Sequence, residues 1–141
     1  MVGTADGQRT AYWDIPRDPN ILAHVRQLIR QTLKGWDLAE SDDLTDDIVL
    51  ASSEVLTNAV LYGLPPIRFS LWITGETLCA EITDHGADRP EPGTDDGEAE
   101  HGRGLGIVAA LSDEWGVQPA QNGPAKTVWF RKKCSPRGSA A

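Results

Sequence analysis

Apolar residues recur at helical spacing in two stretches of the first half of the chain. The first stretch covers about residues 19–34, and its apolar residues are Ile21, Leu22, Val25, Leu28, Ile29 and Leu33. The second follows Ser41 and ends near Tyr62, and its apolar residues are Leu44, Ile48, Ala51, Val55 and Ala59. Intervals of three and four residues place side chains on one helical face. Both stretches therefore predict amphipathic helices.

Shorter segments rich in β-branched and aromatic residues predict five strands, at residues 10–15, 67–73, 77–84, 115–117 and 127–130. The second and third strands form an antiparallel hairpin around a tight turn at residues 74–76. Residues 105–111 return to helical spacing and predict a third helix. Helices and strands in this order predict an α+β sandwich with the helices on one face of the sheet.

Residues 85–103 interrupt this pattern, because they contain four glycines, two prolines and no large apolar residue. A loop of this length inside a compact domain is typically a functional lid or a disordered insert, and we expect a lid here. We expect residues 1–9 to be a disordered leader, residues 10–133 to form one domain, and residues 134–141 to be a disordered tail.

The composition of the chain argues against several classes of function. The 141 residues include 13 Lys and Arg against 21 Asp and Glu, a formal net charge of −8. This balance argues against direct binding of nucleic acid, which requires a basic face. No segment has the apolar length of a membrane span, and no secretory signal is visible. The two cysteines, Cys79 and Cys134, form neither a disulfide framework nor a metal-binding pair. We expect a cytoplasmic protein without a membrane partner.

Glu54 and Asn58 lie one helical turn apart on the second predicted helix, beside its apolar stripe. Residues four positions apart project from the same helical face. An amide oxygen is a suitable ligand for Mg²⁺, and a carboxylate can orient or deprotonate an attacking group. The alternative interpretation is a polar flank of the helix, with Asn58 in a capping or packing role.

Two segments with glycine follow along the chain. Asp84 and Gly86 stand at the end of a predicted strand, where glycine lets a ligand approach the backbone; a simple turn is the alternative. Residues 102–106 (GRGLG) lead directly into the third predicted helix. Backbone N–H groups at a helix N-terminus attract anions, so this segment is a candidate phosphate-binding turn. The three histidines have no cysteine near them, and a zinc site is not expected.

These segments, taken in order, resemble the GHKL ATP-binding superfamily, which includes gyrase, the heat-shock chaperone and histidine kinase ATPase domains. The four motif boxes of that superfamily match, in chain order, Glu54 with Asn58, Asp84 with Gly86, residues 102–106, and residues 123–128 with Thr127. The resemblance covers about residues 10–131. The chain departs from it at Asp88, where family members commonly have a second glycine, and at residues 124–126, which are inserted in the last box.

The resemblance implies a two-layer α/β sandwich whose sheet is mixed and mostly antiparallel, with ATP and Mg²⁺ as ligands. Asp84 would accept a hydrogen bond from the adenine amino group, and Gly86 would allow close approach of the base. Asn58 would coordinate Mg²⁺, and Glu54 would take the proton of the attacking hydroxyl group or water. The remaining ATP-binding residues implied by the resemblance are Arg103, Gly104, Leu105, Gly106 and Thr127.

Within the superfamily, this short single-domain form is similar to bacterial anti-sigma factor serine kinases. The similarity implies a serine/threonine protein kinase that binds a sigma factor and phosphorylates an antagonist protein. It leaves open whether the protein forms a homodimer. The alternative is a non-catalytic module that binds ATP and regulates a partner protein. Glu54 favours phosphate transfer, because a module that only binds ATP does not need this carboxylate.

Overall fold

The computed structural model describes residues 9–36, 38, 42–86, 99–120 and 125–134. In chain order the elements are β1 (Thr10–Ile15), α1 (Ile21–Gly35), α2 (Asp42–Tyr62), β2 (Ile67–Thr74), β3 (Thr77–Asp84), α3 (Ala99–Leu111), β4 (Glu114–Pro119) and β5 (Lys126–Lys133). The predicted order of elements is confirmed. All but the last residue of the predicted leader, most of the predicted lid and all but the first residue of the predicted tail lie outside the described residues.

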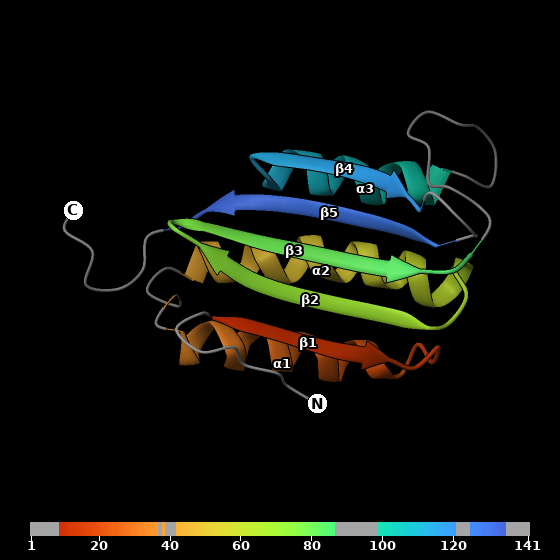
Figure 1. Cartoon of the computed structure of the whole chain (residues 1–141), viewed down its shortest axis with the longest axis horizontal. Coiled ribbons are helices and arrows are strands. Elements are labelled where there is room, and N and C mark those ends of the chain that lie inside the picture. Colours follow the sequence, from red (N-terminus) through yellow and green to blue (C-terminus); the bar gives the residue numbers. More distant parts are fainter. Residues whose placement is uncertain (1–8, 37, 39–41, 87–98, 121–124, 135–141) are drawn as a thin grey trace.

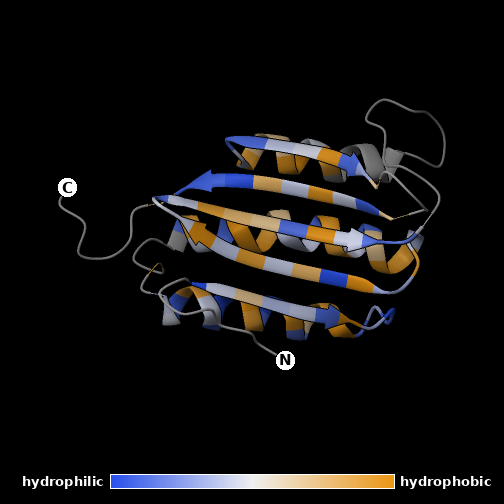
Figure 2. Ribbon diagram, in the orientation of Figure 1, coloured by the Kyte–Doolittle hydropathy of each residue, from blue (hydrophilic) through white to orange (hydrophobic). Residues whose placement is uncertain are grey.

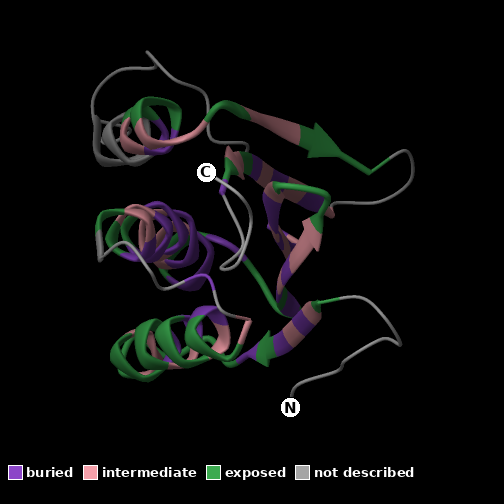
Figure 3. Ribbon diagram, turned by 90° about the vertical axis from the view of Figure 1, so that its left-hand side faces the viewer, coloured by how far each residue is buried: buried purple, intermediate pink, exposed green. Residues whose placement is uncertain are grey.

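The strands form one sheet in the order β1-β2-β3-β5-β4, and the three helices lie together on one of its faces (Figures 1 and 3). The predicted α+β sandwich is therefore confirmed. Each of the four strand pairings is antiparallel, where a mixed sheet was expected. After β3 the chain passes through α3 to the edge of the sheet, where β4 pairs with β5. The strands β3 and β4 run parallel to each other, but β5 lies between them, so no parallel pairing forms.

Alternation along the strands separates a covered face from an uncovered face. Side chains on the covered face are apolar and buried at the centre of the sheet; they include Trp13, Phe69, Leu71, Ala80, Ile82, Val128 and Phe130. The uncovered face carries the alternate residues, among them Trp72, Glu81, Trp129 and Arg131. The hydropathy colouring shows the same change of character along each strand (Figure 2). Burial of the apolar face against the helices is the main driving force for this fold.

The central helix α2 carries the predicted stripe, in which Ile48, Ala51, Val55 and Ala59 are buried. Ser52 and Leu56, outside that stripe, are buried too. The additional burial arises because α2 packs between α1 and α3 as well as on the sheet, and Figure 3 shows it as the middle helix. Glu54 and Asn58 lie on this middle helix, and both are partly buried.

The third helix begins at Ala99, earlier than the predicted start at residue 105. Residues 99–101 (AEH) can themselves form a first turn, and each glycine inside a helix costs only about 1 kcal/mol relative to alanine. The glycine-rich residues 102–106 therefore lie within α3 and not in a loop before it. In the described part of the chain, no helix is long and apolar enough to cross a membrane.

Candidate functional site

A cavity lies where the last turns of α2, the end of β3, the start of β5 and α3 come together. It is lined by Val55, Asn58, Ala59, Tyr62, Asp84, Leu105, Lys126 and Val128. Most of these side chains are apolar, and the polar groups are few. The space between these side chains is only about 10 Å³, so a ligand as large as a nucleotide base would require them to move apart, and the few polar groups would then orient it.

Asp84, the last residue of β3, is the central polar group of the cavity. Its side chain is 5% exposed, and its Oδ1 accepts a hydrogen bond from the Gly86 N–H at 2.8 Å. Its Oδ2 lies 4.0 Å from the ammonium nitrogen of Lys126, whose side chain is 10% exposed. Asp84 and Lys126 are direct partners in the β3–β5 register. Buried Asp and Lys side chains are rare outside pairs, so this pair marks a specialised position.

Two glycines bring the end of α2 against the end of β3. Gly63 donates its N–H to the carbonyl of Ala59 at 2.9 Å, and a Cβ at Gly63 would stand 2.6 Å from the Asp84 Cγ. A Cβ at Gly86 would stand 3.0 Å from the Gly63 Cα. Gly86 thus lies in close contact with a second protein segment, and its role in letting a ligand approach stays a prediction. Gly63 was not predicted as a site residue, because its role depends on this long-range contact.

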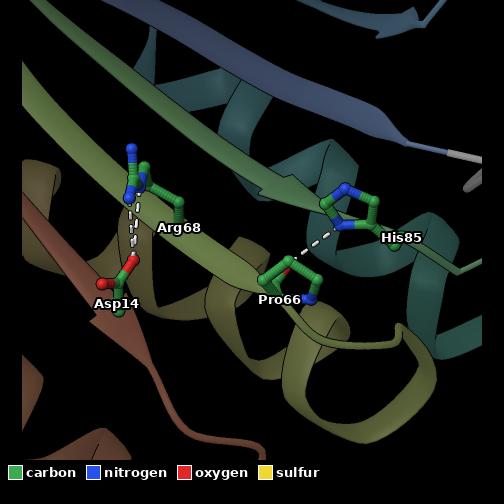
Figure 4. A network of polar contacts seen from close by, with 4 residues as sticks. All are labelled: Asp14, Pro66, Arg68 and His85. Carbon is green, nitrogen blue, oxygen red and sulfur yellow. Dashed lines mark hydrogen bonds and ion pairs between the residues drawn. The ribbon is translucent and has the colours of Figure 1, made fainter.

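The segment after β3 is also fixed to the segment after α2 by hydrogen bonds. His85 donates its backbone N–H to the Leu64 carbonyl at 2.8 Å, and its Nδ1 lies 2.9 Å from the Pro66 carbonyl oxygen (Figure 4). The same view shows Arg68 bound to Asp14, an exposed pair that joins β2 to β1. His85 therefore holds the corner beside Asp84 in place, outside the cavity lining.

Replacing Gly63 with alanine should test this close packing. We expect Gly63→Ala to lower the free energy of unfolding by about 1–3 kcal/mol, because the new methyl group overlaps the Asp84 carboxylate and the Ala59 carbonyl. Gly35→Ala is the matched control: no atom lies within 4 Å of a Cβ there, so its stability should be unchanged or slightly higher. Urea unfolding of both variants measures the difference. Equal stability would mean that the corner has room to relax.

Asn58 and Glu54 occupy neighbouring turns of α2, and both are partly buried. Asn58 lines the cavity, whereas Glu54 lies one turn further from the helix end and is outside the lining. Among the described residues, no group of three His, Cys, Asp or Glu side chains could hold a metal ion. Asn58 could serve as one oxygen ligand of a Mg²⁺ that takes its other ligands from water and phosphate, which is the usual manner of Mg²⁺ binding.

The glycine-rich residues are brought to the cavity only in part. Leu105 is buried and forms part of the wall, while Gly106 is exposed. Gly104 and Gly106 lie beyond the first turn of α3, where helical N–H groups already bond to carbonyls of the preceding turn. Contact between their N–H groups and a phosphate would require unwinding at the start of α3, and it stays a prediction. The side chain of Arg103 is outside the described part.

Thr127 is not brought to the cavity. Its Oγ1 lies 2.7 Å from the Oγ1 of Thr83, its partner in the β3–β5 register, on the uncovered face of the sheet. Neighbouring strand residues point to opposite faces, so Lys126 takes the position beside the cavity. The sequence pattern predicted the strand only from residue 127, which left Lys126 outside it. Extending the alternation of Val128 and Phe130 by one step would have placed Lys126 on the covered face.

Comparisons with known proteins agree with the fold described above and identify the family of the chain. A family model described as the histidine kinase-like ATPase domain matches residues 15–132. Among solved structures, the RsbU and RsbW domains of Rv1364c from Mycobacterium tuberculosis are 20% identical in sequence, with a TM-score of 0.67. This match covers 90% of the chain but only 32% of the solved protein.

A blue-light activated histidine kinase from Erythrobacter litoralis EL346 is similar over 93% of the chain and 70% of its own kinase domain. It is 22% identical, with a TM-score of 0.48. None of the curated protein sequences is similar enough to count as a relative. The family model, however, spans most of the chain, from the last residue of β1 to the last but one residue of β5. The chain therefore belongs to the histidine kinase-like ATPase domain family.

Proposed function

We propose that the chain binds ATP in this cavity, with the adenine amino group donating a hydrogen bond to Asp84. The observation that carries the proposal is the buried Asp84 carboxylate, which faces a cavity walled by apolar side chains. Val55, Leu105 and Val128 offer surfaces for the faces of a flat ring. A carboxylate only accepts hydrogen bonds, so it favours a base edge that presents an amino group.

Asn58 and Glu54 would act on the phosphate side of the same ligand. The amide oxygen of Asn58 suits Mg²⁺, which neutralises charge on the phosphates when it is bound. Glu54, one turn further along the same face of α2, would accept the proton of the attacking hydroxyl group. Phosphoryl transfer depends mainly on positioning and charge neutralisation, so few protein groups are needed.

The function that this site supports best is that of a regulatory serine/threonine protein kinase. The protein would bind a sigma factor as an anti-sigma factor and phosphorylate an anti-sigma factor antagonist protein. The similarity in fold to a structure with an RsbW domain supports this choice. The second candidate is a module that holds ATP as a conformational ligand. The presence of Glu54 one turn from Asn58 favours transfer, because a module that only binds ATP does not need this carboxylate. Cys79 and Cys134 are both free thiols, which supports a cytoplasmic site of action.

Calorimetric titration with MgATP and MgGTP tests the proposed ligand. We expect the affinity for ATP to be at least about tenfold higher than that for GTP. The guanine oxygen would face the Asp84 carboxylate, and both groups are hydrogen-bond acceptors. Equal affinity for the two nucleotides would contradict the adenine assignment. Phosphate transfer from labelled ATP to an antagonist protein encoded beside this chain then separates the kinase from the binding module. Tight ATP binding without transfer to any such antagonist would favour the module.

A further inference from the structure

The face of the sheet that the helices leave uncovered contains a second, half-open cavity, which we call the sheet-face cavity. Its volume is about 150 Å³, and it is bounded by β2, β3, β4 and β5. The side chains of the uncovered face that line it are Trp72, Cys79, Glu81, Gln118, Trp129 and Arg131. A closed cavity of about 150 Å³ holds benzene in another protein, so the sheet-face cavity is large enough for a small organic ligand.

A glycine on β4 determines how Trp129 lies beside this cavity. Gly116 is the direct partner of Trp129 in the β4–β5 register, and a Cβ at Gly116 would stand 2.8 Å from the Cζ2 atom of the indole. The indole therefore lies over the backbone of β4, where a larger residue would displace it. The space beside Cys79 stays open between Trp129 and Trp72, and all three side chains line the cavity.

Glu81 gives the sheet-face cavity a negative charge that the protein does not neutralise. It is partly buried, and among the described residues no hydrogen bond or ion pair involves its carboxylate. Arg131, the charged residue opposite it in the lining, lies 3.8 Å from Glu114, and its guanidinium lies 5.0 Å from the centroid of the Trp129 ring. Glu81 is thus available to an external cation, and the net charge of −8 of the chain attracts cations in general.

We propose that the sheet-face cavity binds a small organic cation, with its charged group at Glu81 and its apolar body against Trp72. A cation is attracted by a carboxylate and also by the face of an aromatic ring, and tryptophan is the best ring for this contact. Trp129 already carries Arg131, whereas in the described part of the chain Trp72 has neither a cation nor another ring against it. An amidinium or guanidinium group fits best, because its N–H groups can donate to both carboxylate oxygens.

Titration with benzamidine, followed through the indole N–H signals of the tryptophans in NMR spectra, tests the proposal. We expect benzamidine to bind at least about tenfold more tightly than benzyl alcohol, which has a similar ring without the charge. Benzoate, with the opposite charge, should not bind. The acetylated amide of arginine carries the same kind of cation on a side chain. Binding of either cation supports the site, and the tighter of the two identifies the source as a free molecule or a partner's side chain.

Two pairs of variants assign the binding to the lining residues. Glu81→Gln keeps the shape of the side chain and should lower the benzamidine affinity about tenfold, whereas Glu76→Gln, at an exposed turn outside the lining, should leave it unchanged. Trp72→Leu should also weaken binding. Tyr12→Leu removes an aromatic ring from the same face outside the lining and is the matched control.

Three results would overturn the proposal. The first is a Trp72 signal that does not move with benzamidine up to about 10 mM, which would mean that no site exists. The second is equal benzamidine affinity in Glu81→Gln and the wild type. The third is a Trp72 signal that changes on dilution of the protein and not with benzamidine, because a second copy of the chain would then cover this face. ATP affinity should be the same in Glu81→Gln and the wild type, since the nucleotide cavity lies on the covered face, so this proposal and the proposed function can fail separately.

Discussion

Asp84→Asn is expected to weaken ATP binding by about 100-fold while leaving the fold intact. The wild-type carboxylate has two acceptor oxygens, one for the Gly86 N–H and one for the base. Asparagine has one oxygen, and Gly86 holds it at 2.8 Å, so its NH₂ group would face the adenine amino group. Two donors would then point at each other in a buried cavity. Calorimetry with MgATP measures the loss.

The control is Asp113→Asn, which makes the same chemical change outside the cavity. Asp113 is exposed and accepts the Lys133 backbone N–H at 2.6 Å, so it also holds a backbone donor. ATP affinity should be unaffected in this variant. A thermal melt of Asp84→Asn separates a binding defect from unfolding, because the substitution also removes the charge opposite Lys126. A folded Asp84→Asn that binds ATP as tightly as the wild type would contradict the assignment of the cavity.

Local sequence patterns were sufficient to predict the sheet hairpin, α2 and the position of Asp84. The stripe from Ile48 to Ala59 has the helical period, and residues 77–84 alternate up to the strand end. Both signals depend on side chains near one another in the sequence. Asp84 is the last residue of such a strand and precedes Gly86, and its predicted role in a site came from the motif order that resembles the GHKL superfamily.

Features that depend on contacts between distant segments could not be predicted in this way. Gly63 matters because Asp84 and Gly86, more than twenty positions later, pack directly against it. The choice of Thr127 over Lys126 has a different cause, since Thr127 was named from the resemblance to the last motif box and Lys126 lay just outside the predicted strand. The predicted strand began at residue 127, whereas β5 begins at Lys126 opposite Asp84. The alternation of Val128 and Phe130 already indicates the face of Lys126, whereas its pairing with Asp84 depends on the register with β3 and comes only from the structure.

Glu54→Ala is expected to lower the rate of phosphate transfer by roughly 100-fold or more, the usual effect of losing a general base. ATP affinity should stay near that of the wild type, because Glu54 lies outside the cavity lining, one helical turn from Asn58. Asn58→Ala should instead weaken the Mg²⁺-dependent part of ATP binding, since Asn58 lines the cavity. A lower transfer rate with unchanged ATP affinity in Glu54→Ala, together with weaker ATP binding in Asn58→Ala, would distinguish the proton acceptor from the metal ligand.

Labelled phosphate transfer from ATP to an antagonist protein, with free phosphate measured in parallel, gives the rate. Asp43→Ala is the matched control, because it removes an exposed carboxylate from the first turn of the same helix. Its transfer rate should equal that of the wild type. If Glu54→Ala transfers phosphate as fast as the Asp43 control, Glu54 is not the base. Its partial burial beside Asn58 would then reflect only the packing of α2 within the helical layer, and the acceptor of the proton would have to lie on another element or on the substrate.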